Sequence, residues 1–99
     1  MKFNIDSVIK NINKPWTPVD LEKFDDLVLR IALFEGEYHE HSHLYDEFFF
    51  VYKGEIKIWT ERGDIELKAG EGITIPKNLK HKPIARIPSF VLMIDSLKG

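Results

Sequence analysis

The sequence predicts a single all-β domain, and two observations carry that prediction. From Asp26 onward, short runs of β-branched and aromatic residues are separated by turn residues, which is typical of all-β chains. The chain has 99 residues, of which 43% are hydrophobic, so it can build one modest core but not two. Several short strands in so short a chain must close into a barrel or pack as two sheets to hide their edges.

Residues 1–25 carry weaker signals and are predicted to form an N-terminal arm. Asp6 or Ser7 is suited to cap a short helical turn, and Pro15 and Pro18 would prevent that turn from extending. No internal repeat, low-complexity tract or linker divides the sequence. We therefore predict one domain over residues 1–99, with the arm at 1–25 and a β-barrel core at 26–96.

Six strand candidates follow the arm. Within residues 55–68, Ile56 and Ile58 alternate with charged residues, and the alternation resumes after the turn residues Arg62-Gly63-Asp64. This pattern predicts a hairpin with one solvated face. The candidate strands are 26–34, 47–54, 55–63, 64–70, 71–76 and 89–96.

The strand candidate at 47–54 is apolar on both faces. Because side chains alternate along a strand, one face carries Glu47, Phe49 and Val51, and the other carries Phe48, Phe50 and Tyr52. The second face needs cover from the arm, from a second subunit or from another part of the chain. The first face is predicted to line the barrel together with Ile73 and Ile75, giving a tight, apolar pocket suited to a small ligand.

Composition excludes several classes of function. With 14 basic and 16 acidic residues, the formal charge of −2 gives no field that would draw nucleic acid or an anionic membrane. There is no cysteine, so disulfides, thiolate metal sites and thiol nucleophiles are excluded. The N-terminal residues offer no continuous apolar stretch for a signal peptide or membrane span, and we expect a cytoplasmic protein.

Three of the four histidines occupy alternate positions in the stretch 36–53. On an extended strand His39, His41 and His43 would lean to the same side, with Glu47 close behind them. Imidazole nitrogens with a carboxylate oxygen suit first-row divalent metals such as Mn, Fe, Co, Ni, Cu and Zn. The alternative is a set of solvated strand and loop residues in front of an ordinary core strand.

Two spaced motifs make the chain resemble a small single-domain cupin. The first motif is matched by His41, one residue, His43, three residues, Glu47, six residues and Gly54. The second is matched by Gly70, five residues, Pro76, four residues and His81. The 15 residues between Gly54 and Gly70 resemble the short intermotif spacing of microbial cupins.

The resemblance implies a jelly-roll β-barrel and a metal held by His41, His43, Glu47 and His81. His39 is then left over as a rim residue, for which a solvated position is favoured over a role beside the metal or substrate. The sequence departs from the motifs in three places: Gly36 lies one residue too close to His41, Asn78 replaces a glycine, and Ala85 replaces an asparagine. Asn tolerates the left-handed conformation, so the second departure is mild.

Four ligand candidates leave coordination positions open in a five- or six-coordinate site, where water or substrate could bind. A purely structural metal would require a closed tetrahedral site and is the less favoured interpretation. The identity of the metal stays open, because this ligand set accepts several ions.

Two functional hypotheses follow. The family includes dioxygenases, isomerases, epimerases and decarboxylases, so the resemblance implies a small metalloenzyme acting on a small organic or sugar-like ligand, and a homodimer. The alternative is a non-catalytic binding or sensing module, favoured by the lack of an evident acid or base beyond the ligands.

A few further polar residues are candidates to reach the predicted pocket. Arg30, Tyr38 and Tyr45 are the first candidates to reach it, although a surface position is favoured for each. Lysines around His81 could draw an anionic substrate, although lysines in a turn are usually only solvated. The residues concerned are Lys77, Lys80 and Lys82.

Overall fold

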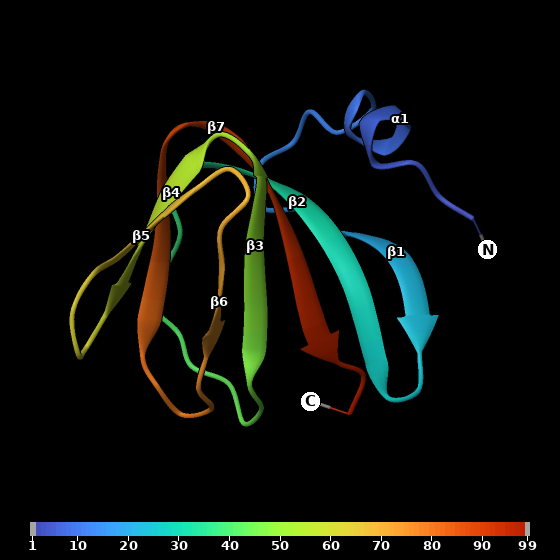
Figure 1. Ribbon diagram of the computed structural model, residues 1–99. Helices are drawn as coiled ribbons and strands as arrows, with labels where there is room; N and C mark the ends of the chain where they lie inside the picture. The colour runs from blue at the N-terminus through green and yellow to red at the C-terminus, as the bar shows by residue number, and fades with distance from the viewer. Residues whose placement is uncertain (1, 99) are drawn as a thin grey trace.

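The computed structural model describes residues 2–98 as one helix and seven strands (Figure 1). Within this range no helix combines the length and apolar character needed to cross a membrane. The elements are α1 (Ile5–Ile9), β1 (Val19–Phe24), β2 (Leu27–Glu37), β3 (Glu47–Lys53), β4 (Glu55–Thr60), β5 (Ile65–Lys68), β6 (Gly72–Ile75) and β7 (His81–Ser96).

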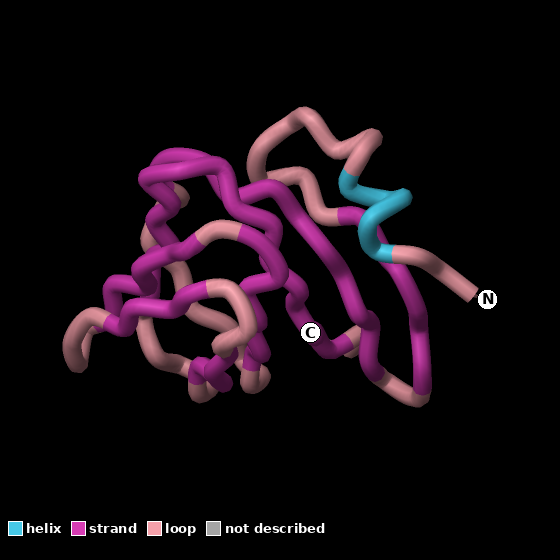
Figure 2. The backbone as a smooth tube through the Cα atoms, turned by 45° about the horizontal axis from the view of Figure 1, so that its top comes forward, coloured by secondary structure: helices cyan, strands magenta, loops and turns pink. Residues whose placement is uncertain are grey.

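All strands belong to one antiparallel sheet, which confirms the all-β prediction. Strands β1, β2, β7, β3 and β6 follow one another across the sheet, and β4 pairs with both β7 and β5. The long strand β7 changes partners along its length: residues 81–84 pair with β4 and residues 90–94 pair with β3. The sheet curves round its core with the helix outside it (Figures 1 and 2). Among the described residues β5 and β6 are not paired, so the barrel is open along that seam.

The core lies on the concave side of this sheet. Burial alternates along β3, where Glu47, Phe49 and Val51 are buried and the intervening residues are only partly so, as the sequence predicts. The predicted hairpin forms between β4 and β5, with Ile58 opposite Ile65. At roughly 25 cal/mol per Å² of apolar surface, burial of this kind is the main force holding the sheet in its curved shape.

The N-terminal segment differs from the prediction in two ways. The cap of α1 is Asn4, whose side chain accepts a hydrogen bond from the Ser7 N–H at 3.0 Å, rather than Asp6 or Ser7. Residues 19–24, predicted as part of the arm, form strand β1, which pairs with β2 across a tight turn at Asp25. This strand is largely exposed, so it has neither the apolar run nor the alternation by which the other strands were recognised.

The arm supplies part of the cover for the outer face of β3. The Tyr52 hydroxyl donates a hydrogen bond to the Asp6 carboxylate of α1 at 2.7 Å, and Lys53 lies 3.8 Å from the same carboxylate. The arm, a second subunit and another part of the chain were the three kinds of cover expected for this face. In the structure the arm covers the end of the face, at Tyr52 and Lys53.

Strand β7 begins eight residues earlier than predicted, at His81 rather than Ser89. Its first half contains Pro83 and Pro88, and proline normally argues against a strand because it lacks an N–H donor. Here Pro83 still contributes its carbonyl, which accepts a hydrogen bond from the Tyr38 N–H at 3.1 Å. The early start matters for function because it places His81 in the sheet.

Candidate metal site

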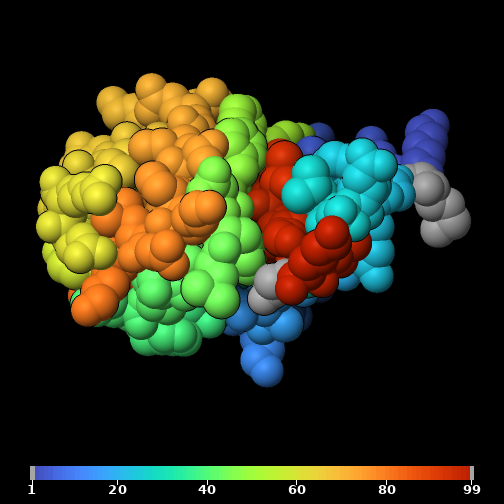
Figure 3. Space-filling view, turned by 90° about the horizontal axis from the view of Figure 1, so that it is seen from below, coloured from blue at the N-terminus to red at the C-terminus, as the bar shows by residue number. Residues whose placement is uncertain are grey.

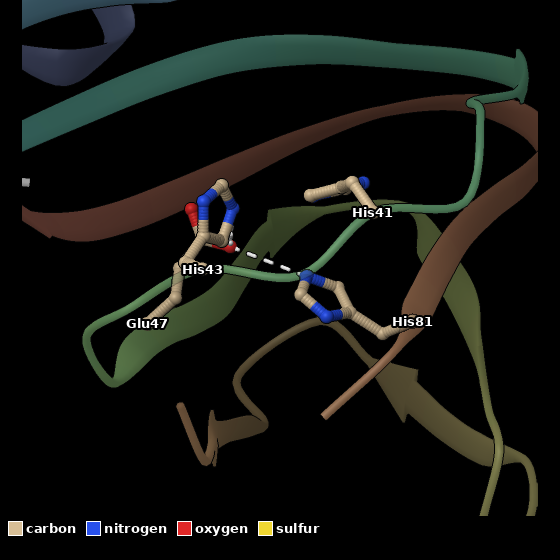
Figure 4. Close-up of side chains that lie close together, drawn as sticks. All are labelled: His41, His43, Glu47 and His81. Carbon is tan, nitrogen blue, oxygen red and sulfur yellow. Dashed lines mark ion pairs between the residues drawn. The ribbon is translucent and has the colours of Figure 1, made fainter. Parts of the chain in front are cut away.

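Three separate parts of the chain supply the four predicted ligands. His41 and His43 lie in the segment between β2 and β3, and Glu47 is the first residue of β3. His81 is the first residue of β7, far away in sequence. The side chains of His41, His43, Glu47 and His81 converge on one point (Figure 4) and are called the His/Glu cluster below.

The backbone fixes this arrangement. The His41 N–H donates to the His81 carbonyl at 3.0 Å, and the His81 N–H donates to the His41 carbonyl at 2.9 Å. The His43 carbonyl accepts from the N–H of Asn78 at 2.7 Å. Asn78 has φ 68°, the left-handed conformation for which Asn is suited. In the space-filling view the segment before β3 (green) lies beside the start of β7 (orange; Figure 3).

The segment carrying His41 and His43 is not the extended strand that the alternating histidines suggest. It is a loop with a single isolated bridge between His41 and His81. Gly36, one residue closer to His41 than the motif requires, lies at a bulge in the pairing of β2 with β7 and has φ 84°. The bulge and loop, rather than strand alternation, bring both imidazoles to the same side.

The ligand atoms lie close enough to share one ion. One potential ligand atom from each member of the cluster lies within 4.8 Å of all the others. Glu47 Oε1 lies 3.3 Å from His43 Nε2 and 3.5 Å from His81 Nε2, the ion pairs drawn in Figure 4. Such a cluster of three imidazoles and one carboxylate suits a first-row divalent metal.

Hydrogen bonds to the backbone select the nitrogen that two of the three imidazoles offer. His41 Nδ1 lies 3.0 Å from the His39 carbonyl, and His81 Nδ1 lies 2.9 Å from the Leu79 carbonyl. A carbonyl only accepts, so the neutral ring must carry its proton on Nδ1 and leave a lone pair on Nε2. This second hydrogen bond is the usual partner of a metal-binding histidine.

Two buried atoms of the cluster lack a hydrogen-bond partner among the described residues. They are Glu47 Oε1 and His81 Nε2, in side chains of residues that are 6% and 1% exposed. Leaving a buried polar atom unsatisfied costs roughly 1–3 kcal/mol. A cation between these two atoms would satisfy both, so the residues fit a metal ion.

The charges inside the cluster are coupled. Burial acts to raise the pKa of Glu47, but His81, Asp95 and His43 together outweigh it and lower that pKa. Burial acts to lower the pKa of His81, but its interactions with the Glu47 carboxylate and the Leu79 carbonyl raise it. For His41, burial prevails and lowers the pKa. Glu47 is therefore ionised at neutral pH and attracts positive charge.

The sequence analysis missed Asp95, which lies on β7 beside Glu47. It is 5% exposed, and one carboxylate oxygen, Oδ2, lies 3.3 Å from Arg30 Nη1. Burial, with the nearby Glu47 carboxylate, raises the pKa of Asp95 to about 7. The sequence did contain a signal: Val91, Met93 and Asp95 alternate, so Asp95 shares the inward face of an apolar strand.

A cavity of about 300 Å³ opens beside the cluster. Trp16, Phe34 and Tyr38 form an aromatic part of its wall, with ring centroids 4.6 Å apart for Trp16 and Phe34 and 4.9 Å apart for Trp16 and Tyr38. Phe49 lines it as predicted, whereas Val51 and Ile75 lie in the apolar core. The cavity is large enough for one small ring.

Three polar residues line the cavity, although the sequence favoured a surface position for each. Arg30, Tyr38 and Tyr45 all line the cavity, so the surface positions favoured for them are wrong. Tyr45 stacks on His43 with ring centroids 5.0 Å apart. The exposed His39 also lines the cavity, stacks on Tyr38 at 4.0 Å and holds His41 through its carbonyl.

The three lysines around His81 are not part of the cavity wall. The Lys82 ammonium group lies 2.6 Å from the Glu37 carboxylate, which neutralises it. The side chains of Lys77 and Lys80 belong to exposed residues, and their backbone N–H groups bond to Asp46 and Glu61. Their arrangement does not supply an anion-binding wall.

Comparison with known proteins agrees with these observations. Residues 31–95 match the family model of the cupin domain. The uncharacterized protein YdbB of Bacillus subtilis (strain 168) is 27% identical over 94 residues, covering 93% of this chain and 83% of YdbB. A cupin-2 domain containing protein from Shewanella frigidimarina has a crystal structure that is 30% identical with a TM-score of 0.92, covering 95% of this chain and 93% of its own.

One structural relative was solved with a metal and a ligand. The crystal structure of hydroquinone 1,2-dioxygenase PnpCD in complex with Cd²⁺ and 4-hydroxybenzonitrile has a TM-score of 0.81 and is 22% identical. The match covers 97% of this chain and 72% of that one. At this level of identity the similarity concerns the fold.

Proposed function

The chain belongs to the cupin family, and from that premise we propose that it binds one divalent transition metal ion through the His/Glu cluster and uses it to act on a small organic ligand. The observation that carries the proposal is the pair of buried atoms Glu47 Oε1 and His81 Nε2, which lie 3.5 Å apart and form no hydrogen bond among the described residues. Buried polar atoms without partners are rare in native proteins. Two facing one another inside a set of four ligand atoms are best explained by a cation.

We propose a metalloenzyme of the dioxygenase type as the activity, with isomerase or epimerase chemistry as the other reaction class. When bound, the ion supplies Lewis acidity or a centre for oxygen activation. The chain holds the ligand in a cavity whose aromatic wall, Trp16 with Phe34 and Tyr38, limits its size. A hydroquinone 1,2-dioxygenase among the structural relatives supports a phenolic or similar small ring as the first substrate to test.

A non-catalytic binding or sensing module is the alternative function. It was favoured by the absence of an acid or base beyond the ligands, but the cavity contains Asp95, a buried carboxyl group next to Glu47. Asp95 is therefore a candidate acid or base beyond the metal ligands, which favours the enzyme over the binding module.

Metal binding is tested with Co²⁺, whose visible absorption reports its ligands. We expect the wild-type protein to bind one equivalent. His81→Gln should weaken binding by more than about 100-fold, since even changes to outer partners of metal ligands cost roughly 10- to 100-fold. His39→Gln is the matched control, because it changes a nearby histidine whose side chain lies outside the cluster, and it should bind Co²⁺ like the wild type. Equal affinities in all three proteins would contradict the proposal.

Catalysis is tested separately with an oxygen electrode. The Fe²⁺-loaded protein should consume oxygen when given hydroquinone or catechol, and Glu47→Gln should not. Metal loading with ligand binding but no turnover of any offered substrate would favour the binding module.

A homodimer and a cytoplasmic location complete the proposal. The partly exposed apolar residues on the outer face of β3 support a dimer, and the lack of cysteine supports a reducing compartment. Light scattering of the purified protein would test the first, and fractionation of cells of the source organism would test the second.

A further inference from the structure

Asp95 lines the cavity and keeps one buried hydrogen-bond acceptor without a partner among the described residues. It is 5% exposed, it lines the cavity wall, and its Oδ1 has no hydrogen-bond partner among the described residues. Its other oxygen, Oδ2, is occupied by Arg30 Nη1 at 3.3 Å. A buried acceptor left free at a ligand site is either a cost to stability or a place for a ligand atom.

The position of Asp95 beside Glu47 argues for a functional reason. Phe48 pairs with Ile94 in neighbouring strands, and the next residues along, Glu47 and Asp95, both line the cavity. Like charges opposite one another in adjacent strands are destabilising, and more so when buried. An apolar residue would continue the pattern of β7 without that cost, so stability alone does not account for an aspartate.

Arg30 determines which ligand group this position accepts. Its Nε donates to the Asp20 carboxylate at 2.8 Å while its Nη1 contacts Asp95, so one positive charge is shared by two carboxylates. Among the described residues, no lysine lines the cavity beside Asp95. A ligand carboxylate or phosphate placed directly against Asp95 would therefore be repelled, whereas a hydroxyl or N–H group would be accepted there.

We propose that Asp95, held by Arg30, forms a polar subsite that accepts a hydrogen bond from a hydroxyl or N–H group of a neutral ligand bound at the His/Glu cluster. The inference rests on the proposed metal site and adds the ligand class: a small molecule with one metal-binding oxygen and a neighbouring hydrogen-bond donor. Asp95 is a positioning and specificity residue in this scheme.

The test compares two probes that differ in one donor. Catechol carries two adjacent hydroxyl groups, and guaiacol replaces one of them with a methyl ether that cannot donate. Dissociation constants for both are measured from the visible spectrum of the Co²⁺-loaded protein, first for the wild type and then for Asp95→Asn. In that variant the amide oxygen faces Arg30 and the amide NH₂ faces the cavity, so the acceptor is lost with little change in size.

We expect the preference for catechol over guaiacol to fall about tenfold in Asp95→Asn, the effect of losing one hydrogen bond at a buried acceptor. The matched control is Asp20→Asn, which removes the other carboxylate at Arg30 but does not line the cavity. Its preference should equal that of the wild type. Comparing this preference between the variant and the wild type cancels any difference in how well the two probes chelate the ion.

The outcomes separate the two proposals. If Co²⁺ does not bind at all, the proposed function fails and this inference fails with it. If Co²⁺ binds but catechol does not, or if Asp95→Asn keeps the wild-type preference, only this inference is overturned. An equal loss of the preference for catechol in Asp20→Asn would also overturn it. The effect would then come from any change in the charge around Arg30 and not from the acceptor on Asp95. Should Asp95→Asn fail to fold, Asp95→Val is measured in its place, with the same expected loss.

Discussion

Replacing Asp95 with Asn in the metal-free protein should remove a pH dependence of stability. Burial and the neighbouring Glu47 carboxylate raise the pKa of Asp95 from 3.8 to about 7 in the folded state. The folded protein therefore binds a proton more tightly at this residue than the unfolded chain does. The contribution of Asp95 to stability is fully present below pH 3.8 and is lost as the pH rises through about 7.

The size of the effect follows from the shift. The folded and unfolded pKa values differ by about 3 units, from 3.8 to about 7, and at about 1.4 kcal/mol per unit this corresponds to about 4 kcal/mol. That is a large fraction of the roughly 5–15 kcal/mol by which most domains are stable. Asn resembles the protonated carboxyl group in size and carries no charge at any pH, so the variant should lack this loss.

Urea unfolding in the presence of EDTA, at intervals between pH 4.5 and 7.5, measures the effect. We expect the two proteins to have similar free energies of unfolding at pH 4.5 and the variant to be the more stable at pH 7.5, by on the order of 2–4 kcal/mol. Taking the difference between them removes the titration of His41 and His81, which both proteins share. A difference that stays constant with pH, or that grows in favour of the wild type, would refute the reasoning.

Two further predictions concern backbone and cavity. Gly54→Ala should lower the free energy of unfolding by roughly 2–4 kcal/mol, because a Cβ there would collide with the Ser89 side chain at φ 93°. Gly70→Ala, at φ 89° with open space, controls for strain alone in the same urea experiment. With Trp59→Phe as background, the fluorescence of Trp16, which lines the cavity, should be quenched by Co²⁺ bound at the His/Glu cluster. Unchanged emission at saturating Co²⁺ would place the ion elsewhere.

The sequence predicted the strands whose apolar residues alternate or run continuously, and missed those that have neither pattern. The hairpin of Ile58 and Ile65 was recognisable because one face is buried and the other solvated. Strand β1 was missed because both of its faces are largely exposed, and the first half of β7 because Pro83 and Pro88 interrupt it. A sequence pattern reveals a strand only where burial imposes one. Pairing with a distant strand can form a strand in a segment that has no such pattern.

The members of the His/Glu cluster could be selected from the sequence, but their surroundings could not. The resemblance to cupins selected His41, His43, Glu47 and the distant His81, and the structure brings these four side chains together. The groups that surround these ligands could not be found from sequence spacing. A backbone carbonyl fixes the tautomer of His41 and another fixes that of His81, and Asp95 lies at the opposite end of β7 from His81. Such contacts depend on how the strands pair.

The most direct test of the central claim is anomalous X-ray diffraction from crystals of the Co²⁺-loaded protein at the cobalt edge. We predict one strong peak per chain, at bonding distance from the Nε2 atoms of His41, His43 and His81 and from the carboxylate of Glu47. A peak at any other position, coordination through Nδ1, or no peak in crystals grown with saturating Co²⁺ would contradict the account.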